Sequence, residues 1–262
     1  MAFFTTLYSG SSGNCGVVWC GEKYLLIDMG KSCRTTLTAL KSLGFGPSGL
    51  AGILITHEHV DHVNGLQVFL KKYPVPVYSS AATLDNLTEQ GILPEEVEKI
   101  ALDGRREDVS GFAVSAFLTS HDVPCCGFRI QTPDGKTMTI ATDLGILTPT
   151  VHENLSGADL VALEANYDLE MLRTGPYPYY LKRRIESARG HLSNDECAAK
   201  LLELMQEGCK KFALCHMSKE NNTPDHVLGT LKRTLFAAGV RPEAGTFVQV
   251  QLRNEVSPPL EF

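Results

Sequence analysis

The chain has no excess of positive charge. Its 262 residues include 24 lysines and arginines against 30 aspartates and glutamates, which gives a formal net charge of −6. This balance excludes a protein that binds nucleic acid through a positive field spread over its whole surface. Any contact with a polyanion must therefore use a local basic patch.

Long apolar runs are also missing. None approaches the roughly 20 residues that a membrane-spanning helix needs. The first residues have neither the basic start nor the long apolar stretch of a secretory signal. We therefore expect a cytoplasmic protein without a membrane span. Apolar residues still make up 43% of the chain, which is enough for an ordinary globular core.

Cysteine pairs with the spacing of a zinc knuckle are absent as well. The chain has eight cysteines, but no two of them are separated by two residues, and their spacing is irregular. The chain is also too long for a small fold that depends on disulfides. We therefore expect reduced and mostly buried thiols. Internal repeats, low-complexity segments and obvious linkers are not found.

One short run is unusually rich in metal-binding side chains. Residues 56–62 read Thr-His-Glu-His-Val-Asp-His, so three imidazoles and two carboxylates occupy six consecutive positions. These groups bind divalent first-row metals. A polar loop with a chance histidine is the alternative, but it does not explain three of the eight histidines in one run. The apolar strand predicted just before it would hold the ligands rigidly, so we predict a metal site.

Short apolar runs separated by turn residues predict the secondary structure. We expect strands at residues 5–8, 16–19, 23–28, 51–55, 75–78, 112–117, 127–132, 136–142, 160–164 and 212–215. We expect helices at residues 32–43, 64–72, 80–90, 94–99, 193–207 and 224–238. Asp134-Gly135 indicates a hairpin, and Ser193 with Glu196 indicates a capping box. Two β-rich blocks, each followed by helices, predict a layered α/β fold of two packed sheets with helices outside.

Four further polar residues stand where short apolar strands are expected to end. They are Asp28, His121, Asp143 and His216. Each one alone fits a turn residue, a helix cap or a solvated side chain. Because the pattern repeats, we expect ligand-type residues to converge at one edge of the sandwich.

In order and type, these residues resemble the motifs of the metallo-β-lactamase-fold hydrolases. The resemblance implies an αββα sandwich of two mixed β-sheets flanked by helices, with two divalent metal ions (zinc, manganese or iron) at one edge. It implies that one metal is bound by His57, His59 and His121, and the other by Asp61, His62 and His216. Asp143 would bridge the two metals, and Asp28 would support the ligands by hydrogen bonding.

Other segments narrow the branch of the superfamily, because glyoxalase II also fits the metal ligands alone. Residues 9–15, 164–168, 175–185, 190–194 and 216–224 together resemble the YycJ/WalJ-like subfamily of bacterial metallo-β-lactamase-fold proteins. The resemblance covers essentially the whole chain and implies a single domain over residues 1–262. It also implies a metal-dependent phosphodiesterase with 5′-to-3′ DNA exonuclease activity, in which the dinuclear site activates a hydroxide. The chain has Tyr167 where the subfamily usually has histidine.

A basic and aromatic segment favours DNA as the substrate. The densest basic cluster follows three tyrosines and comprises Lys182, Arg183, Arg184 and Arg189. Basic groups neutralise phosphates, and aromatic rings stack on unpaired bases. Taken alone, the cluster fits a solvated helix face equally well. The residues that we expect to bind the substrate are Asn14, Asn166, Lys182, Arg183, Arg184 and Asn194.

Three residues are expected to act in catalysis. They are Asp61, Asp143 and His191, of which His191 would protonate the leaving oxygen. Simple packing at the entry of a helix is the alternative role for His191. Two other functions stay open, namely a small-molecule hydrolase of a thioester, lactone or cyclic phosphodiester, and a catalytically silent binding protein.

Overall fold

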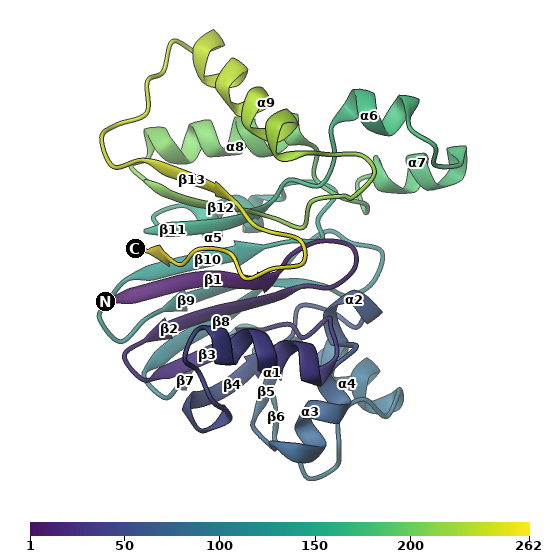
Figure 1. Ribbon diagram of the computed structural model, residues 1–262, viewed down its shortest axis with the longest axis vertical. Coiled ribbons are helices and arrows are strands. Elements are labelled where there is room, and N and C mark those ends of the chain that lie inside the picture. Colours follow the sequence, from purple (N-terminus) through teal and green to yellow (C-terminus); the bar gives the residue numbers. More distant parts are fainter.

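Two seven-stranded sheets pack face to face in the computed structural model, which describes all of residues 1–262 (Figure 1). The first sheet has the order β14-β1-β2-β3-β4-β5-β6, and the second has the order β13-β12-β11-β10-β9-β8-β7. Helices cover the outer face of each sheet. This arrangement confirms the predicted αββα sandwich.

The strands of the first sheet are β1 (Ala2–Tyr8), β2 (Cys15–Cys20), β3 (Lys23–Ile27), β4 (Leu50–Leu54), β5 (Val77–Ser79), β6 (Lys99–Ala101) and β14 (Leu260–Glu261). Those of the second are β7 (Arg106–Val109), β8 (Phe112–Leu118), β9 (Cys126–Gln131), β10 (Thr137–Ala141), β11 (Leu160–Glu164), β12 (Lys211–Cys215) and β13 (Phe247–Val250). The helices are α1 (Cys33–Ser42), α2 (Val60–Val63), α3 (Leu66–Lys72), α4 (Ala81–Glu89), α5 (Pro149–Leu155), α6 (Leu169–Thr174), α7 (Tyr179–Ile185), α8 (Asn194–Gln206) and α9 (Pro224–Ala237), with a short 3₁₀ turn at Pro47–Gly49.

Three apolar clusters stabilise the layers. The first lies between the sheets and includes Phe4, Leu25, Phe112 and Phe128, whose side chains come from both sheets. The second packs β10, β11 and β12 against α5, α8 and α9. The third packs the first sheet against α1, α3 and α4. Burial of these side chains is the main favourable term for such a layered fold.

The strand directions bring the expected ligands to one edge. In the second sheet β10, β11 and β12 are parallel, so their carboxyl ends lie side by side. β8 runs in the same direction as β10, because each is antiparallel to β9. In the first sheet β3 and β4 are parallel. The segments that follow these strands therefore emerge together, on the side of the molecule that carries α2 (Figure 1).

Local sequence signals were reliable where they were strong. The capping box is confirmed, since the Ser193 side chain caps the Glu196 N–H and the Glu196 side chain returns to the Ser193 N–H. The hairpin at Asp134-Gly135 is also confirmed, because β9 and β10 pair across it and Gly135 has φ +83°. Seven of the eight cysteines are buried, as expected.

The helix predicted at residues 94–99 is wrong. Only one turn forms there, in which the Val97 N–H donates to the Pro94 carbonyl at 3.3 Å. Lys99 already belongs to β6 and pairs with Val77 of β5. A segment of six residues is too short to be stable as a helix on its own, so strand pairing decides its conformation. Pairing likewise creates β7 and β13, which were not predicted, and the short helices α2, α5, α6 and α7 were also missed.

No helix of this fold combines the length and the apolar composition required to cross a lipid bilayer.

Candidate metal centre and active site

The histidine-rich run lies at the end of β4, as expected. His57 follows the strand and is fully buried, and His59 is the N-cap residue of α2. Asp61 and His62 belong to that single helical turn. The turn folds the run back on itself, so the His57 and His62 ring centroids are 4.2 Å apart. Local structure alone therefore gathers this part of the ligand set.

The remaining ligands follow neighbouring strands. Asp28 comes after β3, His121 after β8, Asp143 after β10 and His216 after β12. Asp28, Asp143 and His216 have φ values of +63°, +57° and +54°. The left-handed conformation costs a non-glycine residue about 1–2 kcal/mol. Backbone strain is thus concentrated where the ligands enter the site, which is typical of functional positions.

Two sets of candidate metal ligands form, called below the first and the second ligand set, and Asp143 lies between them. His57, His59 and His121 make one group, and Asp61, His62 and His216 make another; within each group the possible ligand atoms lie within 4.8 Å of one another. Asp143 groups with His57 and His62 as well as with His216. Its Oδ2 is 3.3 Å from His62 Nε2, and its Oδ1 is 3.9 Å from His121 Nε2. This is the arrangement that a bridging carboxylate requires.

Several ligand atoms in this cluster have no hydrogen-bond partner. The buried atoms without one include His57 Nε2, His121 Nε2, His216 Nε2 and Asp143 Oδ2. Unpaired buried polar atoms are rare in native structures, because each leaves a desolvation cost unpaid. Imidazole nitrogens and carboxylate oxygens are suitable donors for zinc, manganese or iron. The residues therefore fit a pair of divalent cations.

The other ring nitrogen of several histidines is fixed by an acceptor. His62 Nδ1 donates to Asp28 Oδ2 at 2.8 Å, and Asp28 also accepts from the Thr56 N–H at 2.8 Å. His121 Nδ1 donates to the Gly190 carbonyl at 3.1 Å. A proton held on Nδ1 leaves the Nε2 lone pair free for a metal. The structure thus places Asp28 where the predicted supporting role needs it.

The pKa shifts of the cluster differ between its members, so some side chains are held neutral and others are held charged. Burial, together with neighbouring histidines, lowers the pKa of His57 well below its usual value, which favours the neutral ligand form. Burial opposes a charge on His62, but Asp143 and Asp28 outweigh it and raise the pKa to about 9. Burial also opposes ionisation of Asp61, yet His216 and His62 keep its pKa below the usual range.

Glu164 belongs to this site, although the sequence did not single it out as a site residue. It ends β11 and is fully buried. Its Oε1 accepts from His216 Nδ1 at 2.7 Å and from His191 Nδ1 at 2.8 Å. These two histidines overcome the effect of burial and hold the pKa of Glu164 well below its usual value. The sequence signal was a charged residue closing an apolar strand, beside strands that end before Asp143 and His216.

His191 lies next to the second ligand set. Besides its bond to Glu164, its Nδ1 is 3.8 Å from Asp143 Oδ1. The side chain is 18% exposed, so part of the ring reaches solvent. Because Glu164 is an acceptor at Nδ1, His191 Nε2 is the atom left to carry a transferable proton.

Two of the three asparagines expected to bind substrate lie against candidate ligands, Asn14 beside Asp61 and His62, and Asn166 at 3.4 Å from His216 Nδ1. Asn14 Nδ2 is 3.1 Å from His62 Nε2 and 3.4 Å from Asp61 Oδ2. Asn166 is buried and donates to the His216 carbonyl at 2.8 Å. Asn194 is fully buried and exchanges amide hydrogen bonds with Asn222.

The substrate contacts expected for Asn166 and Asn194 therefore have no support in this geometry and stay predictions. Both amides are used inside the protein, where they position the backbone around His216 and the start of α8. Their polarity is explained by the need to pair buried groups.

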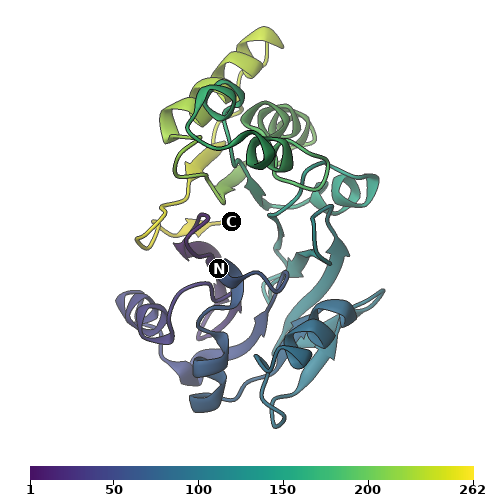
Figure 2. The ribbon, with the colours of Figure 1, turned by 90° about the vertical axis from the view of Figure 1, so that its right-hand side faces the viewer.

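The basic cluster lies on α7, and the structure divides it. Arg184 forms an ion pair with Asp122, whose Oδ1 is 3.4 Å from His59 Nε2 and 3.2 Å from His121 Nε2. Lys182 Nζ donates to the Arg173 carbonyl at 2.8 Å. Arg183 is exposed and makes no ion pair or hydrogen bond through its side chain. Figure 1 places α6 and α7 on the same side as α2, and Figure 2 faces that side.

The tyrosines of this region take different positions. Tyr179 and Tyr180 open α7 and are 76% and 75% exposed. Tyr167 is buried in a small cluster with Leu172 and Ile185, which attaches α6 and α7 to the rest of the protein. Tyr167 thus has a packing role, whereas the other two rings are free to contact a ligand.

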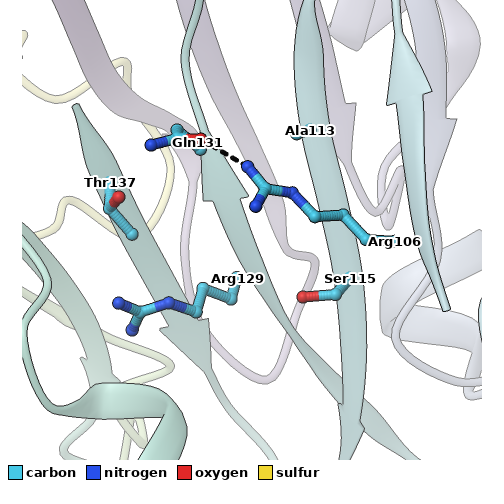
Figure 3. A pocket seen from close by; sticks show the side chains of 6 residues that line it. All are labelled: Arg106, Ala113, Ser115, Arg129, Gln131 and Thr137. Carbon is cyan, nitrogen blue, oxygen red and sulfur yellow. Dashed lines mark hydrogen bonds between the residues drawn. The ribbon is translucent and has the colours of Figure 1, made fainter. Parts of the chain in front are cut away.

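A hollow of about 190 Å³ on the second sheet lies apart from these residues. Its lining side chains include Arg106 and Arg129, with Ser115 between their strands (Figure 3). Arg129 donates to the carbonyl groups at the end of α5, and Arg106 donates to Gln131. Both guanidinium groups are thus used within the fold, and no predicted site residue lines the hollow.

Comparison with known proteins agrees with this geometry. Residues 23–217 match the family described as the beta-lactamase superfamily domain. The chain therefore belongs to this superfamily, as a metallo-β-lactamase-fold hydrolase.

Its relatives place it more narrowly. The chain is 34% identical over 237 residues to exodeoxyribonuclease YycJ of Bacillus anthracis. The aligned region covers 90% of each chain. It is 34% identical over 238 residues to exodeoxyribonuclease WalJ of Streptococcus pneumoniae serotype 2, covering 90% of this chain and 88% of the relative. The predicted resemblance to the YycJ/WalJ-like subfamily is thus confirmed.

The fold also matches a solved structure. The metallo-beta-lactamase fold protein YhfI from Bacillus subtilis superposes with a TM-score of 0.74 at 18% identity, over 98% of both chains.

Proposed function

We propose that this protein is a metal-dependent phosphodiesterase that degrades DNA as a 5′-to-3′ exonuclease. The observation that carries the proposal is the pair of ligand sets that share Asp143, with a basic helix beside them. The names of the relatives support DNA as the substrate. The 5′-to-3′ direction follows from the subfamily resemblance of the sequence, and a cytoplasmic location fits a DNA substrate.

Two divalent cations would be bound by the residues of the two sets. The first set is His57, His59 and His121, the second is Asp61, His62 and His216, and Asp143 joins them. Zinc, manganese or iron would be accepted by these donors. Cations in such a site supply a nucleophile at neutral pH and neutralise charge on the phosphate.

The protein's own groups position the reaction and handle its protons. Asp61 keeps a 28% exposed carboxylate at the mouth of the site, so it can accept a hydrogen bond from the attacking water. His191 Nε2 would donate a proton to the leaving oxygen, while Glu164 fixes its ring through Nδ1. A positioned general acid typically contributes about 10²–10⁴-fold to a rate.

The surface beside the site suits a polyanion with unpaired bases. Arg183 offers a free charge, and Tyr179 and Tyr180 offer exposed rings on the same helix. Cations bind the backbone phosphates, and aromatic rings stack on bases without sequence preference. A small ester would not reach these residues, so they favour DNA over a small-molecule substrate.

The test is digestion of DNA by purified protein loaded in turn with zinc, manganese or iron. Single- and double-stranded oligonucleotides carry a label at either the 5′ or the 3′ end. We expect early release of a labelled mononucleotide from the 5′ end, and progressive shortening of the strand labelled at the 3′ end. The Asp143→Asn variant and metal-stripped protein are the controls that exclude a contaminating nuclease.

Two results would contradict the proposal. Early release of nucleotides from the 3′ end would reverse the polarity. No cleavage of DNA, combined with turnover of a thioester, lactone or cyclic phosphodiester, would identify a small-molecule hydrolase.

A further inference from the structure

The loop between β1 and β2 lies directly against the second ligand set. The Asn14 N–H donates to the Asp61 carbonyl at 2.8 Å, and Ser9 Oγ accepts from the His216 N–H at 2.9 Å. The Ser9 N–H in turn donates to the Leu252 carbonyl at 3.0 Å. Segments from the start, middle and end of the chain therefore meet beside Asp61 and His216.

Two cationic side chains contact the glycines of this loop. Arg253 follows β13, and Lys31 precedes α1. A Cβ atom at Gly10 would lie 2.8 Å from Arg253 Nη1, and one at Gly13 would lie 2.6 Å from Lys31 Cγ. Glycine at these two positions is what allows both cations to approach the loop.

Neither cation forms an ion pair. Lys31 Nζ donates to Asn254 Oδ1 at 2.8 Å and lies 5.0 Å from the centre of the Tyr8 ring. Arg253 Nη1 is buried and has no hydrogen-bond partner. The Glu220 carboxylate interacts with the charge of Arg253 but forms its own ion pair with Lys219, at 3.4 Å.

The charges of this pair are unfavourable in the protein alone. Burial and the neighbouring Arg253 lower the pKa of Lys31, and burial lowers the pKa of Arg253. Two like charges next to each other, one with an unused buried donor, are stabilised when an anion lies between them. Ser11 and Ser12 are exposed residues at the tip of the loop, and their N–H groups make no hydrogen bond, which adds two further donors.

Lys31 and Arg253 lie beside a different part of the site from α7. The ion pair between Arg184 and Asp122 lies against His59 and His121 of the first ligand set. The loop that carries Asn14 lies against Asp61 and His216 of the second. A strand bound across both sets would therefore meet cations at each end of the site.

We propose that Lys31 and Arg253, with the loop of residues 10–14, form a binding subsite for a phosphate group of the nucleic-acid strand. The inference rests on the proposed DNA phosphodiesterase function and adds a second anchor for that substrate. A guanidinium group binds two phosphate oxygens at once, and an ammonium group adds a point charge.

The test compares Lys31→Gln and Arg253→Gln with matched controls. Lys23→Gln removes an exposed lysine at the start of β3, whose other end reaches the site, and Arg241→Gln removes an exposed arginine that precedes β13. Binding and cleavage of a single-stranded oligonucleotide are measured over a range of salt concentrations. Metal content and thermal unfolding are measured for every variant, so that a misfolded protein is recognised.

We expect each subsite variant to raise KM for DNA about tenfold, because a charge-assisted hydrogen bond is lost. The slope of log affinity against log salt should become shallower by about 0.7 for each phosphate contact removed. The loss on DNA should exceed the loss on a small chromogenic phosphodiester by at least fivefold. The control variants should stay within twofold of the wild type.

Oligonucleotides with and without a 5′-phosphate identify the source of the phosphate. An equal loss on both assigns the subsite to an internal backbone phosphate, and a loss on the phosphorylated strand alone assigns it to the terminal phosphate. Subsite variants that behave like the controls would overturn the inference while leaving the proposed function intact. A wild-type protein that neither binds nor cleaves DNA would overturn both.

Discussion

Replacing Glu164 with glutamine tests whether a buried carboxylate organises the second ligand set. In the folded protein its two oxygens accept four hydrogen bonds. Oε1 accepts from His191 and His216, and Oε2 accepts from the N–H groups of Leu144 and Leu192, at 3.1 and 3.3 Å. A glutamine side chain has only one oxygen, so its NH₂ group must face two donors.

These contacts give the free-energy cost of a glutamine whose amide oxygen stays with the two histidines. If the amide oxygen keeps the two histidines, the Leu144 and Leu192 N–H groups lose their acceptor. A buried donor left unpaired costs about 1–3 kcal/mol, so we expect the unfolding free energy of the metal-free protein to fall by about 3 kcal/mol. The histidines also lose a charged acceptor, which should weaken metal binding by about 10- to 100-fold.

Two measurements check this prediction. Urea unfolding of metal-free protein gives the stability change, and titration with a metal-sensitive dye gives the affinity. Glu207→Gln is the matched control, because it makes the same chemical change at an exposed residue just after α8. We expect that control to change stability by no more than about 0.5 kcal/mol.

A Glu164→Gln protein with wild-type stability and wild-type metal affinity would refute this reasoning. A loss of stability with unchanged metal affinity would show that Glu164 supports only the backbone of the neighbouring strands.

Three further predictions concern the ligands, the proton donor and the basic helix. Elemental analysis should find two metals per chain in the wild type; Asp143→Asn should reduce both, whereas His216→Ala should mainly empty one, and a single metal in the wild type would contradict the dinuclear site. His191→Ala should lower phosphodiester turnover by about 10²-fold or more with near-normal metal content, since it removes the general acid; loss of metal would instead make His191 a ligand. Arg183→Glu should weaken DNA binding and flatten its salt dependence, and an unchanged salt slope in a binding assay would move the phosphate contacts elsewhere. Arg184 is left intact in that test, because a carboxylate there would face Asp122 at the metal site.

Much of the candidate ligand cluster could be predicted because its members are close in sequence or follow strong local patterns. His57, His59, Asp61 and His62 lie within one strand end and one helical turn, so their proximity needs no long-range contact. Asp28, His121, Asp143 and His216 were expected together because each follows an apolar strand. The structure explains why that expectation succeeded: the strands before them share a direction within their sheets.

The substrate-binding predictions that the geometry does not support also have a common cause. Asn194 and Asn166 stand in a polar segment, yet both are buried because partners distant in sequence accept or donate their hydrogen bonds. Arg184 has the residue type of a phosphate contact, but its guanidinium pairs with Asp122, 62 positions earlier in the chain. Residue type does not specify whether a polar group is paired inside the protein or is available to a ligand.

The sequence by itself determined the class of the site, because the identity and local spacing of imidazoles and carboxylates decide which metals and which chemistry they suit. Only the tertiary structure decided which polar groups complete it. Glu164 reaches two histidines from a neighbouring strand, and Lys31 and Asn254 meet although 223 positions separate them. Such contacts depend on the order of strands within a sheet and on the path of the connecting loops. A hydrophobic pattern defines which face of each strand is buried, but it does not define that order.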